Sequence, residues 1–302
     1  MYRLNIITDI GVSSFYYATR YLISWIDPSR LIVTIHRTKY DKDAVNLYIG
    51  DMWNVFRHPL KADIYWIDTP MFYLLDYDRV PLQVYRPKNI WVTSTWNKRM
   101  AEKYFKDVKI VPRPIHPIYI AYTGNTKKEY DLAMIGDDNP KKSYDVFDMV
   151  CRQYGLRCWS TRSYTGLGLY QLVQKLSQTK FLLWVTRTEG YGFPLIEAQA
   201  LGVPAICIQA HANINYCYSA KIDPNLWVRV KTTRTYYYLH NKHLFFEPDI
   251  QDVRRAVEYA LGISMGYYYT ISFKIMNRIR RLVLDTVEYV NKQLTIIAEE
   301  KH

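Results

Sequence analysis

Residues 181–204 read FLLWVTRTEGYGFPLIEAQALGVP, and this stretch decides the fold of the chain. Its first five residues are all apolar, without the alternation of a half-exposed strand, and they predict a buried strand. Gly190 and Gly192 follow in a short loop, where glycine lets the backbone come close to a ligand. Pro194 then begins a predicted helix over residues 194–201, because proline is tolerated in the first turn. A strand, a glycine loop and a helix in this order indicate a parallel α/β sheet.

The start of this helix and two glutamates near it predict the ligand. Backbone N–H groups at a helix N-terminus favour an anion such as a diphosphate. Glu189 precedes the glycines and Glu197 lies about one turn inside the helix, and carboxylates that touched a phosphate would repel it. We therefore expect both to accept hydrogen bonds from hydroxyl groups of a sugar and a ribose. A diphosphate flanked by two sugars is a nucleotide-sugar.

The alternation of strand and helix continues on both sides of this stretch. Apolar runs predict further strands over residues 4–8, 31–35, 62–67, 90–93, 108–111, 132–135 and 205–208. Pro112, Pro114 and Pro117 interrupt the pattern. We predict an α/β fold with two Rossmann-like, doubly wound domains, residues 1–117 and 118–265, and a C-terminal amphipathic helix over 266–302 that packs across them. Ligands of such sheets bind beyond the carboxyl ends of the strands, which places the expected site in a central cleft between the domains.

The same stretch resembles the Glu-x7-Glu signature of GT-B-fold glycosyltransferases, especially the family-4 retaining enzymes. The residues in register are Glu189, Gly190, Gly192, Pro194, Glu197, Ala198, Gly202 and Pro204. The resemblance implies that Glu189 lies by the donor sugar, that Glu197 binds the ribose, and that the backbone of Gly190, Tyr191, Gly192 and Phe193 meets the sugar and phosphates. It also implies a nucleotide-diphosphate-sugar as substrate, transfer with retention, no essential metal and no cofactor.

Other segments add candidates on the same resemblance. Gly11 lies where the family has its first glycine-rich loop, and Asp68 stands in place of a histidine that faces the donor sugar. Lys142 keeps the position of a lysine that stabilises the leaving diphosphate, but Asp137 replaces the arginine that accompanies it. We expect His211, after the strand over 205–208, to contact the donor. The cation that replaces the family arginine is expected to be Arg113 or Arg187.

The composition excludes several classes of protein. The chain has 302 residues, of which 49% are hydrophobic and 29 are tyrosines, so disorder is excluded. No run approaches the roughly 20 apolar residues of a membrane span, and the N-terminus turns polar too early for a signal peptide. The four cysteines form no Cys-x-x-Cys pair and lie near no histidine at zinc-finger spacing, so disulfides and zinc are disfavoured and a reducing, cytoplasmic compartment is predicted. Many tyrosines with 12 glycines hint at a thermophilic or viral source.

The net charge of +12 leaves the partners open. No basic tail stands apart from the folded body, which makes nucleic acid an unfavoured partner. Lys274, Arg278, Arg280 and Arg281 begin the last helix; they form either a solvated face or a surface for peripheral contact with an anionic membrane. Two alternatives to a glycosyltransferase stay open: a nucleotide-sugar epimerase of the same fold, and a basic nucleic-acid-binding protein on a degenerate scaffold. The sequence does not identify the donor base, the sugar or the acceptor, which could be a glycan, a lipid or a protein.

Overall fold

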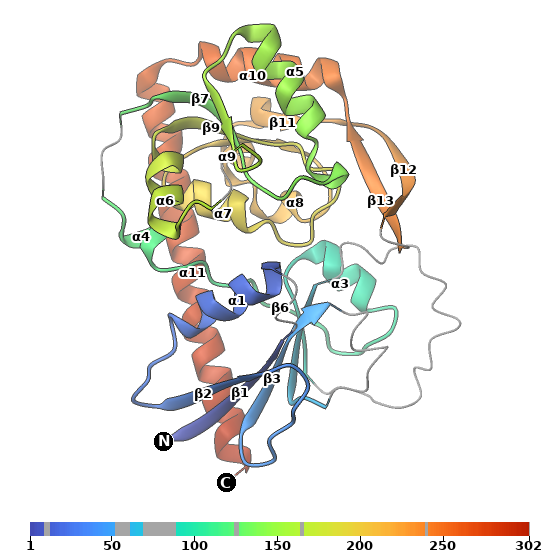
Figure 1. The fold of residues 1–302 in the computed structure, drawn as a ribbon, viewed down its shortest axis with the longest axis vertical. Helices are drawn as coiled ribbons and strands as arrows, with labels where there is room; N and C mark the ends of the chain where they lie inside the picture. The colour runs from blue at the N-terminus through green and yellow to red at the C-terminus, as the bar shows by residue number, and fades with distance from the viewer. Residues whose placement is uncertain are drawn as a thin grey trace. The chain divides into compact units, whose positions relative to one another are not determined.

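The chain divides into two compact units, Met1–Pro117 with Leu282–His302, and Ile118–Arg281. A computed structural model (Figure 1) describes residues 1–8, 13–51, 61–68, 89–123, 127–163, 166–238 and 241–301. We call the two parts the first unit and the second unit. Each contains a parallel sheet, which confirms the predicted α/β class with two doubly wound sheets.

The first unit contains a six-stranded parallel sheet in the order β2-β1-β3-β4-β5-β6. Its strands are β1 (Tyr2–Thr8), β2 (Leu31–His36), β3 (Val45–Asp51), β4 (Ile64–Asp68), β5 (Ile90–Val92) and β6 (Lys109–Ile110). Helices α1 (Ser13–Ile23) and α3 (Thr95–Ala101) belong to the same unit. The sheet core is aromatic: Trp66 and Trp91 are buried and meet edge to face at 5.4 Å.

Strand β3 was not among the predicted strands, because a buried polar residue interrupts its apolar run. Asn46 is fully buried in this strand. Its amide nitrogen donates to the carbonyl oxygens of Asp41 and Ala44 at 2.7 and 2.9 Å, and its oxygen accepts from Asn5 at 2.8 Å. Satisfied in this way, an asparagine can occupy the interior of a parallel sheet.

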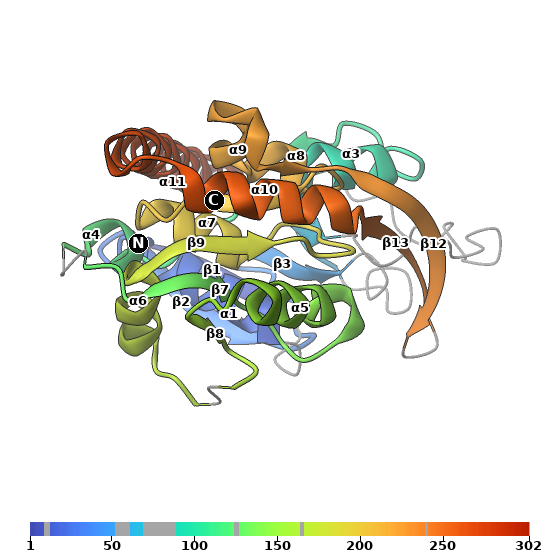
Figure 2. The same cartoon turned by 90° about the horizontal axis from the view of Figure 1, so that it is seen from above.

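The second unit contains a five-stranded parallel sheet in the order β11-β10-β9-β7-β8. Its strands are β7 (Tyr130–Met134), β8 (Cys158–Ser160), β9 (Thr179–Trp184), β10 (Ala205–Ile208) and β11 (Trp227–Val228). Its helices are α4 (Ile118–Ala121), α5 (Tyr144–Tyr154), α6 (Leu169–Ser177), α7 (Phe193–Ala200), α8 (Asn213–Tyr216), α9 (Tyr218–Ile222) and α10 (Ile250–Gly262). Figure 2 shows α5 and α6 on one face of this sheet and α10 with the start of α11 on the other.

A long C-terminal helix, α11 (Met265–Lys301), completes the chain. Its residues up to Arg281 belong to the second unit and those from Leu282 to the first. Ile271, Ile275 and Ile279 are fully buried and recur every four residues, which is the spacing of one helical face. In the part of the chain that the structure describes, no helix has an apolar stretch long enough to cross a bilayer.

One element does not follow the predicted alternation. Strands β12 (Val230–Tyr238) and β13 (Asn241–Pro248) form an antiparallel hairpin in the second unit. Most of the described side chains of β12 are exposed, and Tyr236 stacks on Phe245 at 4.7 Å. A two-stranded hairpin is marginally stable alone, so contacts with the rest of the unit are needed to stabilise it. Arg187 provides part of it, because the Arg187 carbonyl accepts from the Phe246 amide at 2.8 Å.

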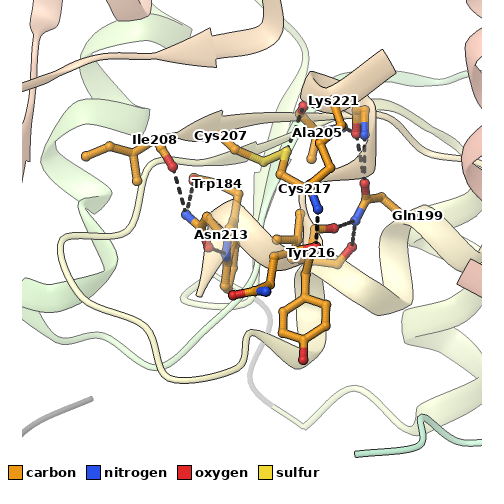
Figure 3. The surroundings of a disulfide bond; sticks show 12 residues. Trp184, Gln199, Ala205, Cys207, Ile208, Asn213, Tyr216, Cys217 and Lys221 are labelled. Atoms are coloured by element: carbon orange, nitrogen blue, oxygen red, sulfur yellow. Dashed lines mark hydrogen bonds between the residues drawn. A yellow bond between two sulfur atoms is a disulfide. The ribbon is translucent and has the colours of Figure 1, made fainter. Parts of the chain in front are cut away.

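The expectation that the chain has no disulfides is wrong. Cys151 of α5 is bonded to Cys158 of β8, and Cys207 of β10 is bonded to Cys217, which lies between α8 and α9 (Figure 3 shows the second). The spacings of 7 and 10 residues match no cysteine motif. In each pair, one cysteine lies in a strand and the other in or beside a helix, so the two meet only once these elements have packed together. The predicted reducing compartment loses its support from cysteine usage, and the cytoplasmic location stays a prediction.

Candidate functional site

The candidate site of the second unit is built on the loop between β9 and α7. Gly192 ends this loop as the residue that caps α7, with a left-handed φ of 87°. A Cβ on Gly192 would lie 3.3 Å from Cγ of Glu189 and 3.4 Å from Nε1 of Trp184, so a larger residue would be both strained and crowded. The structure places the helix at Phe193–Ala200, one residue before the predicted start.

Two of the amides at the start of α7, which were predicted to bind an anion, already donate hydrogen bonds within the protein. Pro194 has no N–H, and the amides of Leu195 and Ile196 both donate to the carbonyl of Gly192, at 3.1 and 3.3 Å. The helix dipole still favours an anion at this end. A phosphate here therefore depends on a cation as well as on backbone amides.

A cation close to this loop is Lys142, in the 3₁₀ turn Pro140–Lys142 that follows β7. Its Nζ lies 2.8 Å from Oε2 of Glu189, and the two side chains are 10% and 16% exposed. Nζ also lies 4.8 Å from the centre of the Trp184 ring. The structure thus brings together two of the predicted catalytic residues, 47 positions apart, at the carboxyl ends of the neighbouring strands β7 and β9.

Two features keep this ion pair in place. Gly136 makes room for the lysine, since a Cβ there would lie 3.0 Å from Cδ of Lys142. Burial alone would raise the pKa of Glu189, but the charge and hydrogen bond of Lys142 outweigh it, so the pKa lies below its usual range. Glu189 is therefore a carboxylate at neutral pH.

His211 lies beside this pair, after β10. It is buried, its backbone adopts a left-handed φ of 39°, and the amide of the next residue, Ala212, donates to the carbonyl of Glu189 at 3.4 Å. Nε2 of His211 lies 2.9 Å from the carbonyl oxygen of Thr186, which can only accept, so Nε2 carries the proton. Burial lowers the pKa of His211 to about 4, and the ring is neutral at pH 7. The predicted donor contact of His211 stays a prediction.

The other predicted donor-binding residues of this loop lie at its base. Glu197 is buried in α7, and Gly190 is buried just after Glu189. The ring of Tyr191 faces the interior, with Phe193 and Tyr216 edge to face at 5.1 and 4.9 Å. The Tyr191 ring therefore packs within the protein, and the predicted donor contact of this loop stays a prediction.

Arg187 is not a cation available to a diphosphate, although the sequence analysis offered it as one. It is 9% exposed, and its guanidinium binds both carboxylate oxygens of Asp145 at 2.9 and 2.6 Å, Glu247 at 2.8 Å and the carbonyl of Pro140 at 2.8 Å. These partners lie on three segments, so Arg187 holds the β9–α7 loop to α5, the 3₁₀ turn and the hairpin. Arg187 acts as a structural clamp.

Asp137, where the family has arginine, is an anion beside two lysines. Burial raises the pKa of Asp137, but the charges of Lys141 and Lys142 and a hydrogen bond from Asn139 lower it below its usual range. Nδ2 of Asn139 donates to Oδ2 of Asp137 at 2.7 Å. Residues 137–142 contain two aspartates and two lysines, so the formal charges of this segment cancel.

The first unit holds a second cluster, at the carboxyl ends of β4, β5 and β6. Arg113 is 2% exposed; it donates to the carbonyl of Trp66 at 3.2 Å and lies 3.7 Å from Oδ2 of Asp68. Asn97 donates to the other oxygen of Asp68 at 2.7 Å. The structure thus joins two predicted residues, Asp68 and Arg113. Asn97 was not among the predicted site residues. The sequence signal for it was its position three residues after Ser94, which caps α3. Gly11 lies outside the described residues.

The described residues contain no group of three or more His, Cys, Asp or Glu that could hold a metal ion. Metal independence stays a prediction.

Comparison with known proteins identifies the fold and the relatives. Two proteins of Sulfolobus islandicus filamentous virus (isolate Iceland/Hveragerdi) are similar in sequence. "Putative glycosyltransferase 41" is 29% identical over 215 residues, 66% of this chain and 62% of that protein. "Putative glycosyltransferase 48" is 25% identical over 242 residues, 74% of each. No family model matches the chain.

Two solved structures are similar to this chain in fold. Sucrose-phosphate synthase from Thermosynechococcus elongatus superposes with a TM-score of 0.65 at 10% identity, covering 98% of this chain and 99% of its own. WaaG, a glycosyltransferase involved in lipopolysaccharide biosynthesis, gives 0.62 at 11% identity, covering 98% and 100%. The chain is a GT-B-fold homologue of the viral proteins. It spans 62% of the length of the first of them.

Proposed function

We propose that this GT-B protein is a glycosyltransferase that moves a sugar from a nucleotide-diphosphate-sugar to an acceptor hydroxyl. The observation that carries the proposal is the buried pair of Lys142 and Glu189 beside the glycine-capped start of α7. A cation, a helix N-terminus and a carboxylate at one sheet edge suit a diphosphate with a sugar attached. The viral relatives and the GT-B neighbours support the same class of activity.

The ion pair suggests a separate role for each residue when the donor binds. In the absence of substrate, Lys142 is neutralised by Glu189. A diphosphate offers the ammonium a more highly charged partner, and Lys142 would then stabilise the negative charge that develops on the leaving group. Glu189, released from the lysine, would accept a hydrogen bond from a hydroxyl of the donor sugar. Glu197 would do the same for the ribose.

Retention at the anomeric carbon and metal independence belong to this proposal through the family resemblance. Without a metal, the leaving diphosphate depends on the lysines of the 3₁₀ turn. Lys141 and Lys142 there lower the pKa values of both Asp137 and Glu189 by their charge. We therefore assign the role of the missing family arginine to this turn rather than to Arg187.

Binding of a nucleoside diphosphate tests the proposal. We expect UDP, GDP or ADP to bind the wild-type protein in isothermal titration calorimetry and to raise its melting temperature. Glu197→Gln removes the carboxylate proposed to bind the ribose and should weaken that binding by about tenfold, because a hydrogen bond to a charged acceptor is worth roughly 1.5–3 kcal/mol. Glu129→Gln is the matched control, since Glu129 is exposed at the amino end of β7.

Two outcomes would overturn the proposal. Conversion of a nucleotide-sugar without any acceptor, seen by product analysis, would identify an epimerase. Salt-sensitive binding of DNA, with no binding of any nucleoside diphosphate or nucleotide-sugar, would identify a nucleic-acid-binding protein on this fold.

We also propose that the start of α11 contacts an anionic membrane surface. Residues 265–284 contain four Lys or Arg and no Asp or Glu. Phe273 and Tyr269 are 62% and 52% exposed on the same helix. Exposed aromatic rings beside cations suit the interface of an anionic leaflet. A lipid acceptor, or an acceptor attached to a membrane, would explain such a surface.

A further inference from the structure

The Cys207–Cys217 disulfide lies at the edge of the candidate site. Cys207 of β10 is paired in register with Trp184, the last residue of β9 before the loop that carries Glu189. Cys217 ends α8 and caps α9. The bond closes a loop over residues 208–216, and this loop contains His211 and Asn213. Both sulfurs are in fully buried residues.

One set of contacts connects this loop to the ion pair. Nε1 of Trp184 donates to the side-chain oxygen of Asn213 at 3.1 Å, and the Asn213 amide donates to the Trp184 carbonyl at 3.4 Å (Figure 3). Trp184 also contacts Lys142, whose ammonium lies 4.8 Å from the centre of the Trp184 ring. The closed loop thus fixes the tryptophan on which the lysine rests.

A second set of contacts connects the disulfide to the helix that carries Glu197. Gln199 of α7 donates to the carbonyl of Tyr216 at 2.8 Å. Its side-chain oxygen accepts from the amide and the hydroxyl of Ser219, both at 3.0 Å (Figure 3 labels Gln199 and Tyr216). Tyr216 and Ser219 flank Cys217, so Gln199 binds α7 to both sides of the disulfide. All three residues are buried, where hydrogen bonds are costly to lose.

We propose that the Cys207–Cys217 disulfide is a positioning element that preorganises the donor site for a nucleoside diphosphate. The inference rests on the proposed function. Cross-linking the loop over 208–216 fixes Asn213 and Trp184 on one side and Gln199 on the other, so that Lys142, Glu189 and Glu197 are held in place before the ligand binds. Preorganisation of this kind increases affinity, because the side chains and the loop are already ordered and binding does not have to supply the free energy of ordering them.

The second disulfide provides a matched control within the same unit. Cys151–Cys158 has a sequence separation of 7, against 10 for Cys207–Cys217. Because loop-closure entropy grows slowly with length, the two bonds stabilise the fold by similar amounts. Cys158 begins β8, at the amino edge of the sheet, whereas the site lies at the carboxyl edge. Its removal should leave the site undisturbed.

The experiment compares C207A/C217A with C151A/C158A. We expect the first double variant to bind the nucleoside diphosphate that the wild type prefers among UDP, GDP and ADP about tenfold more weakly, since a displacement of about 1 Å is enough for such losses. The second should bind within about twofold of the wild type. Equal losses in both variants, or no loss in C207A/C217A, would overturn the inference. Far-UV circular dichroism verifies that both variants are folded.

Hydrogen exchange tests the inference if no nucleotide binds, and reduction of the disulfide in the C151A/C158A background tests it if C207A/C217A fails to fold. Hydrogen exchange of the amides in 186–192 and 195–200 should accelerate in C207A/C217A and not in C151A/C158A; unchanged exchange would overturn the inference. Failure of the wild type to bind any nucleotide would instead overturn the proposed function. In the C151A/C158A background, dithiothreitol supplies two electrons and two protons to the remaining disulfide, giving two thiols and cyclic oxidised dithiothreitol. This reduction should reproduce the loss of affinity and the faster exchange.

Discussion

At the scale of single residues, the site depends on charges held almost out of water. Lys142 and Glu189 are 10% and 16% exposed and 2.8 Å apart. Such a pair contributes little net stability, since both ions lose hydration, but removal of one partner leaves a buried unpaired charge. The pair is therefore better suited to being exchanged for a substrate than to holding the fold together.

Lys142→Met tests this pair through its dependence on pH. We expect the variant to lose about 3 kcal/mol of unfolding free energy at pH 7, because Glu189 is left buried and charged. The pKa of Glu189 is lowered in the native wild type. Its contribution to stability is hence present above the ordinary Glu value and lost as the pH falls through the lowered pKa. In the variant that pKa rises above the unfolded value, so the destabilisation shrinks as Glu189 becomes protonated.

Urea unfolding at pH 7 and pH 4 measures this difference. Lys141→Met is the comparison, since Lys141 lies in the same 3₁₀ turn and its charge lowers the pKa of Glu189 less than that of Lys142 does; its effect should have the same sign and be smaller. A loss of stability by Lys142→Met that is the same at both pH values would contradict the assigned charge state.

Loss of Arg187 should also destabilise the fold. Arg187→Ala removes the shared partner of Glu247 and Asp145; Glu247 keeps Arg234 and Asp145 is 64% exposed, so we expect a loss of about 2 kcal/mol from the missing charged hydrogen bonds. Arg157→Ala is the comparison. Arg157 also pairs with an aspartate but is 61% exposed, and exposed pairs are worth at most about 1 kcal/mol. Similar unfolding free energies for the two variants, measured in urea, would show that Arg187 is no clamp.

At the scale of elements, the first half of α11 has one buried face and one exposed face that carries cations. Lys274, Arg278 and Arg281 are exposed and recur at i, i+4 and i+7, so they share a face of the helix. Phe273, directly before Lys274 in the sequence, is 62% exposed. Each Lys or Arg near an anionic leaflet contributes about 1 kcal/mol, and an inserted aromatic ring adds apolar burial.

Sedimentation with vesicles tests this element. We expect the protein to sediment with phosphatidylglycerol-containing vesicles at low salt and not with phosphatidylcholine alone, with Phe273→Ser and Arg278→Glu each reducing binding by about tenfold. Tyr170→Ser and Arg152→Glu are matched controls on α6 and α5, at the other face of the sheet; Tyr170 is also 62% exposed. Equal effects of both pairs of substitutions would contradict the proposed surface, and a preference for DNA over vesicles would replace it.

At the scale of the whole molecule, the net charge of +12 lies outside the buried cations. Lys142 is paired with Glu189, Arg187 with Asp145 and Glu247, and Arg113 lies near Asp68. These groups add no surplus positive charge. Among the described residues, the positive charge outside these three pairs affects association with anionic partners rather than the fold.

Several features were predictable because they are local. The loop with Gly190 and Gly192, the helix after it, and the periodicity of α11 follow from spacing alone. Strand β3 was missed because Asn46 breaks its apolar run, and its partners Asn5 and Asp41 could not be foreseen. Asn97 and the cysteine pairs were missed for the same reason, since each meets its partner only after the sheet has formed.

The sequence by itself determined the two α/β sheets and the strand, loop and helix that carry the Glu-x7-Glu pattern, because backbone conformation depends on neighbours a few residues away. The tertiary structure decided which charges meet. Strands β7 and β9 are neighbours in the sheet order, and this places Lys142 against Glu189. It also turned Arg187 from a candidate ligand into a clamp, and two unpaired-looking cysteines into a bond beside the site. Contacts between residues far apart in the chain depend on the order of strands, which no local pattern specifies.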